Sequence, residues 1–274
     1  MKNICLIDVY ELDDRAIQRA YAQLSRFKPV FLRTISSGLY RFCSALDRLG
    51  MDGRELKLRC AIYTGESLLP SQKRLVERVL GCRAVCEYGC TELGILALEC
   101  PQGGIHVNHE NLFVEYLRDG LPAEPGKEAE IVVTDLDDYV APLVRYAVGD
   151  LVVPALERCS CGRSLPVLSS VVGRSHDTIA TPGGRAVHAL YFTHLFDRLD
   201  SVHQFRVVQD RIETIRIELK SPQRIAPADV TYLRRAVEAI MGPGVEVHVV
   251  QVSDIPAEPS GKTPWIVSKV RSVN

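Results

Sequence analysis

The segment from Leu58 to Tyr88 carries the pattern that most restricts how this chain of 274 residues can fold. An apolar run over 58–63 is typical of a buried strand, and a second such run covers 84–88. Between them, Pro70 and Gly81 mark the first turn and the end of a helix. Strand, turn, helix and strand in this order favour an α/β layered fold with ligand-binding loops at the strand ends.

The segments on either side extend this organisation. Before it, we expect one helix starting at Asp13 and another over about 39–49, ended by Gly50. After Gly104 the pattern changes to short strands, because Pro and Gly punctuate several apolar runs. We expect these strands at 105–107, 112–117 and 129–134.

A smaller unit is expected after residue 173. Strand-like runs over 205–209 and 212–219 precede a helix beginning at Pro227 and a strand over 245–252. This ββαβ order is typical of a small α+β domain. We therefore expect two domains, residues 1–173 and 174–274.

The composition excludes several classes of function. Lys and Arg number 33 against 34 Asp and Glu, so the formal charge of −1 argues against nucleic acid or an anionic membrane surface as a partner. No apolar run approaches the roughly 20 residues that span a bilayer. Nine cysteines, an odd number without a secretory signal, favour reduced thiols or metal ligands over disulfides. We expect a cytoplasmic protein.

Residues 88–92 read Tyr-Gly-Cys-Thr-Glu where a strand should open into a loop. Tyr88 offers a flat face for a purine, and Gly89 allows the backbone to approach a ligand closely. The Thr91 hydroxyl suits a phosphate, while Glu92 is a hard oxygen ligand for Mg²⁺. The alternative is a helix start with Thr91 as N-cap and Glu92 in the first turn.

Three more short signatures follow. Asp150 ends the string Arg-Tyr-Ala-Val-Gly-Asp, and a carboxylate there can accept two hydrogen bonds from ribose; the alternative is an acid in a surface turn. Arg174 follows a glycine, and its planar guanidinium could contact ribose or phosphate; the alternative is that the segment is an ordinary interdomain linker. Lys262 ends a Ser-Gly-Lys turn near the end of the chain, where an exposed turn is the alternative.

Together and in this order, the four signatures resemble the nucleotide-handling motifs of adenylate-forming acyl ligases, especially the phenylacetate-CoA ligase-like branch. The resemblance implies the C-terminal part of an AMP-binding adenylation domain, followed by a small α+β lid domain. It implies nucleotide contacts from Gly65, Glu66, Ser67, Tyr88, Gly89, Cys90, Thr91, Asp150 and Arg174. The turn at 63–67 is equally typical of a plain β-to-α loop.

The same resemblance implies a reaction. Mg-ATP and a carboxylic acid would give an acyl-adenylate, and a thiol such as coenzyme A would take the acyl group. Lys262, Glu92 and Thr91 are the implied catalytic residues, and the lid would rotate about a hinge at His176 and Asp177.

A second group of residues is independent of the nucleotide. Cys100 and His106 flank a Pro-Gln-Gly-Gly turn, and Cys159 and Cys161 follow later; three thiolates and one imidazole would complete a structural Zn²⁺ site. Spacing alone favours free thiols, but members of the phenylacetate-CoA ligase-like branch carry Cys/His pairs at these places. His109 is the reserve ligand.

One family feature is missing from the sequence. Such ligases open with a phosphate loop rich in Ser, Thr and Gly, and the segment from Thr34 to Gly38 is a poor match that lies too near Tyr88. We therefore expect the chain to begin inside the large domain. The alternative function is a non-catalytic nucleotide-binding subunit that pairs as a homodimer or with a complementing chain bearing the loop.

Overall fold

The computed structural model describes residues 3–8, 13–174, 178–196, 199, 201–257 and 263–270. The chain divides into two compact units, Met1–Val171 and Val172–Asn274. Among the described helices, none combines the length and the apolar character that crossing a membrane requires.

Three helices form the first part of the N-terminal unit. Helix α1 (Asp14–Phe27) begins where expected, because the Asp13 carboxylate accepts a hydrogen bond from the third residue beyond it at 2.6 Å. Helix α2 (Ser36–Arg48) begins three residues before the expected position. Helix α3 (Pro70–Leu80) ends at Gly81, whose φ of 65° is the left-handed conformation that glycine adopts readily. The sequence prediction of α3 is confirmed.

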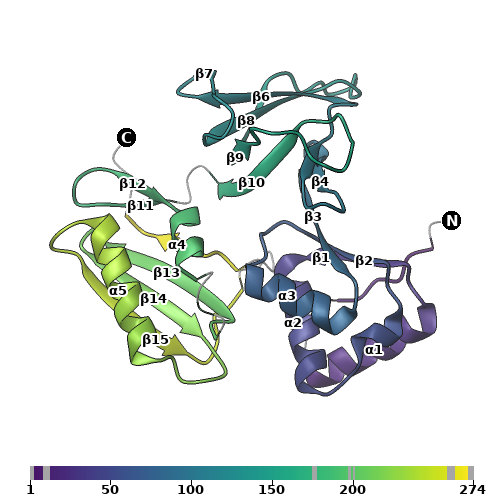
Figure 1. The fold of residues 1–274 in the computed structure, drawn as a ribbon, viewed down its shortest axis with the longest axis horizontal. Helices are drawn as coiled ribbons and strands as arrows, with labels where there is room; N and C mark the ends of the chain where they lie inside the picture. Colours follow the sequence, from purple (N-terminus) through teal and green to yellow (C-terminus); the bar gives the residue numbers. More distant parts are fainter. Residues whose placement is uncertain are drawn as a thin grey trace. The chain divides into compact units, whose positions relative to one another are not determined.

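These helices cover one face of three parallel strands, β1 (Phe31–Ile35), β2 (Cys60–Thr64) and β3 (Arg83–Cys90) (Figure 1). Alternate side chains of β2 and β3 enter the helix-covered core, because successive residues of a strand point to opposite faces. The centre of this core consists of fully buried apolar residues, among them Ile17, Leu39, Cys43, Leu46, Ala61, Val76 and Ala84.

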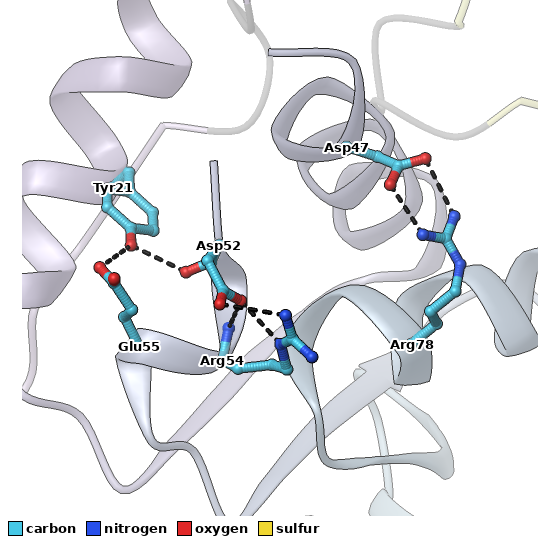
Figure 2. A network of polar contacts seen from close by, with 6 residues as sticks. All are labelled: Tyr21, Asp47, Asp52, Arg54, Glu55 and Arg78. Atoms are coloured by element: carbon cyan, nitrogen blue, oxygen red, sulfur yellow. Dashed lines mark hydrogen bonds and ion pairs between the residues drawn. The ribbon is translucent and has the colours of Figure 1, made fainter. Parts of the chain in front are cut away.

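Figure 2 shows polar contacts that join the helices of this unit to one another and to a short 3-10 helix, η1 (Gly53–Leu56). The Tyr21 hydroxyl donates to the Glu55 carboxylate at 3.0 Å, which ties α1 to η1. Arg78 of α3 makes a two-pronged ion pair with Asp47 of α2, at 2.8 and 2.9 Å. The guanidinium of Arg78 lowers the pKa of the Asp47 carboxyl.

The sheet continues from β3 through antiparallel strands to a total of ten, in the order β1-β2-β3-β4-β5-β10-β9-β8-β6-β7. A second core of buried residues lies among these strands and includes Leu96, Val107, Leu112, Val133 and Val152. The additional strands are β4 (Gly94–Glu99), β5 (Ile105–Val107), β6 (Leu112–Arg118), β7 (Leu121–Pro122), β8 (Ala129–Asp135), β9 (Tyr146–Pro154) and β10 (Val167–Arg174).

The C-terminal unit contains a four-stranded sheet in the order β15-β14-β13-β16 and a separate pair, β11-β12. The expected ββαβ core is confirmed, although the hairpin turn lies at 212–213 and not at 210–211. Its elements are β11 (Thr178–Ala180), β12 (Ala186–His188), α4 (Ala189–Phe196), β13 (Gln204–Arg211), β14 (Thr214–Lys220), α5 (Pro227–Met241), β15 (Glu246–Val252) and β16 (Ile266–Ser268).

Candidate nucleotide site and metal centre

Two of the four signatures meet in the N-terminal unit. The Tyr88 hydroxyl, at the end of β3, donates a hydrogen bond of 2.8 Å to the Asp150 carboxylate in β9. Both residues are nearly buried, with 8% and 9% exposure. Asp150 therefore lies in a strand, and the alternative of an acid in a surface turn is wrong.

The Tyr88 ring does not stand open to solvent. It is part of the second core, packed among residues such as Leu93, Leu96 and Val148. A purine that stacks on this ring must therefore displace part of that packing, whereas the hydroxyl already has a defined role as donor to Asp150.

The rest of this signature forms a tight hairpin between β3 and β4. Thr91 and Glu92 are exposed in its turn, so the alternative reading of a helix start is wrong. A Cβ atom on Gly89 would lie 2.2 Å from the carbonyl oxygen of Gly94. Glycine is thus required here by the close approach of the two hairpin strands, whatever ligand binds. Burial raises the pKa of the Cys90 thiol.

The turn at 65–67 connects β2 to α3, as a plain β-to-α loop would. Gly65 has a φ of 79° and is exposed, as is Ser67. The Glu66 carboxylate accepts a hydrogen bond from the Ser37 backbone N–H at 3.0 Å, in the first turn of α2. The N-terminus of α2, which lies within the segment compared with a phosphate loop, is therefore capped by an acid of this chain.

The remaining signatures belong to the C-terminal unit. Arg174 is the last residue of β10 and is exposed. His176, Asp177 and Lys262 lie outside the described residues.

The four expected zinc ligands converge, although up to 61 positions separate them in sequence. The ligand atoms of Cys100, His106, Cys159 and Cys161 all lie within 4.8 Å of one another. The Sγ atoms of Cys100 and Cys159 are 3.5 Å apart, and His106 Nε2 is 3.2 Å from Cys161 Sγ. His109, the reserve ligand, is exposed and is not part of this group.

The surroundings of the cluster suit a tetrahedral metal ion. The other ring nitrogen of His106, Nδ1, is 3.1 Å from the Leu165 carbonyl oxygen, which directs Nε2 toward the thiols. A Cβ atom on Gly104 would lie 2.8 Å from Cys159 Sγ, so only glycine leaves room for that sulfur. Neither feature was predicted from the sequence, although the glycine at position 104 was a signal that another part of the chain approaches the backbone closely there.

The electrostatics of the cluster favour a thiolate. Burial opposes ionisation of Cys100, but hydrogen bonds from the Gln102 backbone, Cys159 and His106 outweigh it and lower the pKa of Cys100 to about 6. By contrast, burial raises the pKa of Cys82 and of Cys86 to about 11. None of the nine cysteines takes part in a disulfide.

The chain is similar to several known proteins. Residues 179–269 match the family described as the CapK C-terminal domain. A phenylacetate-coenzyme A ligase from Thermus thermophilus is 26% identical over 173 residues, which are 61% of this chain and 39% of the relative. One from Escherichia coli K12 is 24% identical over 257 residues, covering 86% of this chain and 57% of the relative. The chain thus spans about half the length of these relatives, or less.

Solved structures show the same fold. A 2-hydroxyisobutyryl-CoA ligase in the postadenylation state, in complex with R3-HIB-AMP, aligns with a TM-score of 0.79 at 17% identity, over 96% of this chain and 59% of that one. An anthranilate CoA ligase in complex with anthranoyl-AMP aligns with a TM-score of 0.67 at 16% identity, over 92% and 52%.

The fold is therefore that of the C-terminal part of adenylate-forming CoA ligases, which confirms the expected fold class. Within that class, the curated relatives are phenylacetate-coenzyme A ligases. The resemblance to the phenylacetate-CoA ligase-like branch is confirmed.

Proposed function

We propose that this chain carries the nucleoside-binding part and the lid of an adenylate-forming carboxylate ligase. The observation that supports this most directly is the 2.8 Å hydrogen bond between Tyr88 and Asp150, because it joins two motifs that lie 62 positions apart. In this proposal the Asp150 carboxylate accepts hydrogen bonds from the ribose hydroxyls, and the hydrogen bond from Tyr88 fixes the orientation of that carboxylate. The exposed turn at Thr91 and Glu92 then serves the phosphates and Mg²⁺, with the loop at 65–67 near the adenine.

The chemistry has two steps. In the first, a carboxylate oxygen attacks the α-phosphorus of ATP, the bond to the β-phosphate breaks, and pyrophosphate leaves with the metal. The Lys262 ammonium stabilises the charge that develops at the α-phosphate. In the second step, after rotation about 176–177, the sulfur of a thiol such as coenzyme A attacks the acyl carbon, its proton is lost to solvent, and AMP leaves.

Carboxylate-dependent exchange of labelled pyrophosphate into ATP tests the first step. We expect Lys262→Ala to lower the exchange rate by at least about a hundredfold while AMP affinity stays the same. Lys127→Ala removes an exposed lysine of the other unit and is the matched control. An unchanged exchange rate in Lys262→Ala would remove the role proposed for this lysine.

The cysteine and histidine cluster supports a structural zinc ion. Three sulfur ligands and one imidazole nitrogen leave no open coordination position, so the ion would stabilise the fold and take no part in the reaction. Metal analysis of the purified protein should find one zinc per chain, and Cys161→Ser should reduce this content. Cys82→Ser, at a thiol outside the cluster, is the control. Equal zinc content in both variants would contradict the assignment.

A second function, nucleotide binding without catalysis, is favoured by the N-terminus of α2. Because the Glu66 carboxylate already caps it, this helix end is a poor cradle for the β- and γ-phosphates. Calorimetric titration separates the two functions. AMP and ATP binding with equal affinity and no exchange would favour the binding subunit, and activity restored by a chain carrying a phosphate loop would identify its partner.

A further inference from the structure

Gln209 is a polar residue with no exposed surface, placed in the centre of the C-terminal unit. It lies in β13, opposite Ser268 of the neighbouring parallel strand β16. Its side chain reaches the separate pair β11-β12 through Ala180. Three elements that are distant in sequence therefore meet at one amide.

The hydrogen bonds of this amide are complete. Its Oε1 accepts from the Ala180 N–H at 3.1 Å and from the Ser268 hydroxyl at 3.0 Å. Its Nε2 donates to the Ala180 carbonyl at 2.7 Å and, at a longer 3.4 Å, to the Ile212 carbonyl. An amide has two acceptor sites and two donor hydrogens, so Gln209 uses all four.

The contact with Ala180 is reciprocal and resembles the pairing of one strand with another. Ala180 faces Ala186 of β12, and the adjacent Thr181 N–H donates to the Arg185 carbonyl at 2.7 Å. Since hydrogen-bonded positions alternate along an antiparallel pair, both backbone groups of Ala180 point away from β12. Gln209 satisfies them as a further strand would, and its own carbonyl accepts from the Lys269 N–H at 2.9 Å.

We infer that Gln209 is a positioning residue that fixes β11 and β16 to the sheet, so that the C-terminal unit moves as one body. This inference rests on the proposed function, in which the hinge at 176–177 directly precedes β11 and Lys262 precedes β16. A rotation that begins at the hinge can place the lysine only if these two strands are held together.

Hydrogen exchange followed by mass spectrometry tests this in the intact chain. Gln209→Met keeps the length of the side chain but removes all four bonds. We expect exchange at 178–181 and 266–270 to become faster by at least about tenfold, while α5 remains as protected as in the wild type. Ile217→Ala, a fully buried position on β14 without these bonds, is the matched control and should not loosen β11 and β16 selectively. If exchange at 178–181 and 266–270 is not selectively faster in Gln209→Met, the inference is wrong.

A milder variant guards against failure to fold. Ser268→Ala removes the hydroxyl bond to Gln209 together with the local bonds between this hydroxyl and Val270, and it should loosen 266–270 while leaving β11 protected. If exchange at 266–270 is unchanged in this variant, Gln209 does not fix β16 and the inference is wrong.

A kinetic measurement connects the inference to the reaction. In pyrophosphate exchange, Gln209→Met should lower kcat by about tenfold with KM for ATP changed less than about twofold, because all the proposed nucleotide contacts except Arg174 belong to the other unit. A rise in KM for ATP as large as the fall in kcat would contradict a positioning role. If the wild type shows no exchange at all, the proposed function fails, and hydrogen exchange still decides the role of Gln209.

Discussion

The Tyr88 hydroxyl donates a hydrogen bond of 2.8 Å to the carboxylate of Asp150, across a buried space between β3 and β9. These strands are not neighbours in the sheet, since β4, β5 and β10 lie between them. The contact is therefore not a product of strand pairing. It brings an aromatic residue and an acid, which the sequence offered only as separate motifs, into one place.

Tyr88→Phe should weaken AMP binding. The variant keeps the buried ring but releases the Asp150 carboxylate from its donor, and a hydrogen bond to a charged group contributes about 1.5–3 kcal/mol. We expect the Kd for AMP, measured by calorimetric titration, to rise by about tenfold. Tyr116→Phe removes a tyrosine hydroxyl elsewhere in the same unit and should leave the Kd unchanged. Equal affinity in the wild type and Tyr88→Phe would argue against a nucleotide site at this pair.

Gly89→Ala should destabilise the N-terminal unit without any ligand present. The added methyl group would lie 2.2 Å from the Gly94 carbonyl oxygen, so the hairpin must open. We expect a loss of about 2–3 kcal/mol in the free energy of unfolding by denaturant titration. Gly94→Ala is the control. The φ of 69° at this position is strained for alanine, but nothing lies within 4 Å of the added methyl group, so the loss of stability should be about 1 kcal/mol. Similar losses in both variants would refute the steric argument.

Helices α1, α2, α3 and α5 and several strands could be predicted from the sequence because their signals are local, whereas α4 was not predicted. Asp13 caps α1, and the pair Pro70 and Gly81 delimits α3. In these cases residue type and short spacing carry the information. The metal cluster is different, because spacing alone favoured free thiols and the resemblance to the phenylacetate-CoA ligase-like branch supplied the case for zinc.

Long-range pairing could not be predicted in the same way. The register that brings Val167 of β10 opposite His106 of β5 joins the two halves of the metal cluster, yet nothing near either residue specifies its partner. The short strands β11 and β16 were not predicted for a related reason: each has only three residues, which are too few to show alternation. The role of Gln209 could not be predicted from the sequence, because it depends on those two strands.

Gly104→Ala should weaken zinc binding although Gly104 is not a ligand. A Cβ atom there would lie 2.8 Å from Cys159 Sγ and would push that sulfur away from the other three ligand atoms. We expect zinc affinity, measured by competition with a chelator, to fall by about tenfold or more. Gly103→Ala is the control for backbone strain: its φ of 87° disfavours alanine, but nothing lies within 4 Å of the added methyl group. Identical affinity in both variants would show that the cluster tolerates movement of Cys159.

Tyr116→Phe should change how stability depends on pH. Among the described residues the buried Tyr116 hydroxyl has no hydrogen-bond partner, and burial raises its pKa to about 12. Above pH 10 the unfolded chain loses this proton while the folded chain keeps it, so the wild type loses stability between pH 10 and about 12.

In Tyr116→Phe this contribution is absent, and the unpaired hydroxyl is gone as well. We expect the variant to be at least as stable as the wild type at pH 7, since phenylalanine buries no unpaired polar group. Its advantage should then grow by on the order of 1 kcal/mol as the pH rises from 9 toward 12, in urea titrations at each pH. Tyr139→Phe, at a residue that is 88% exposed, should track the wild type throughout. A constant difference between Tyr116→Phe and the wild type over this range would mean that Tyr116 titrates normally in the folded chain.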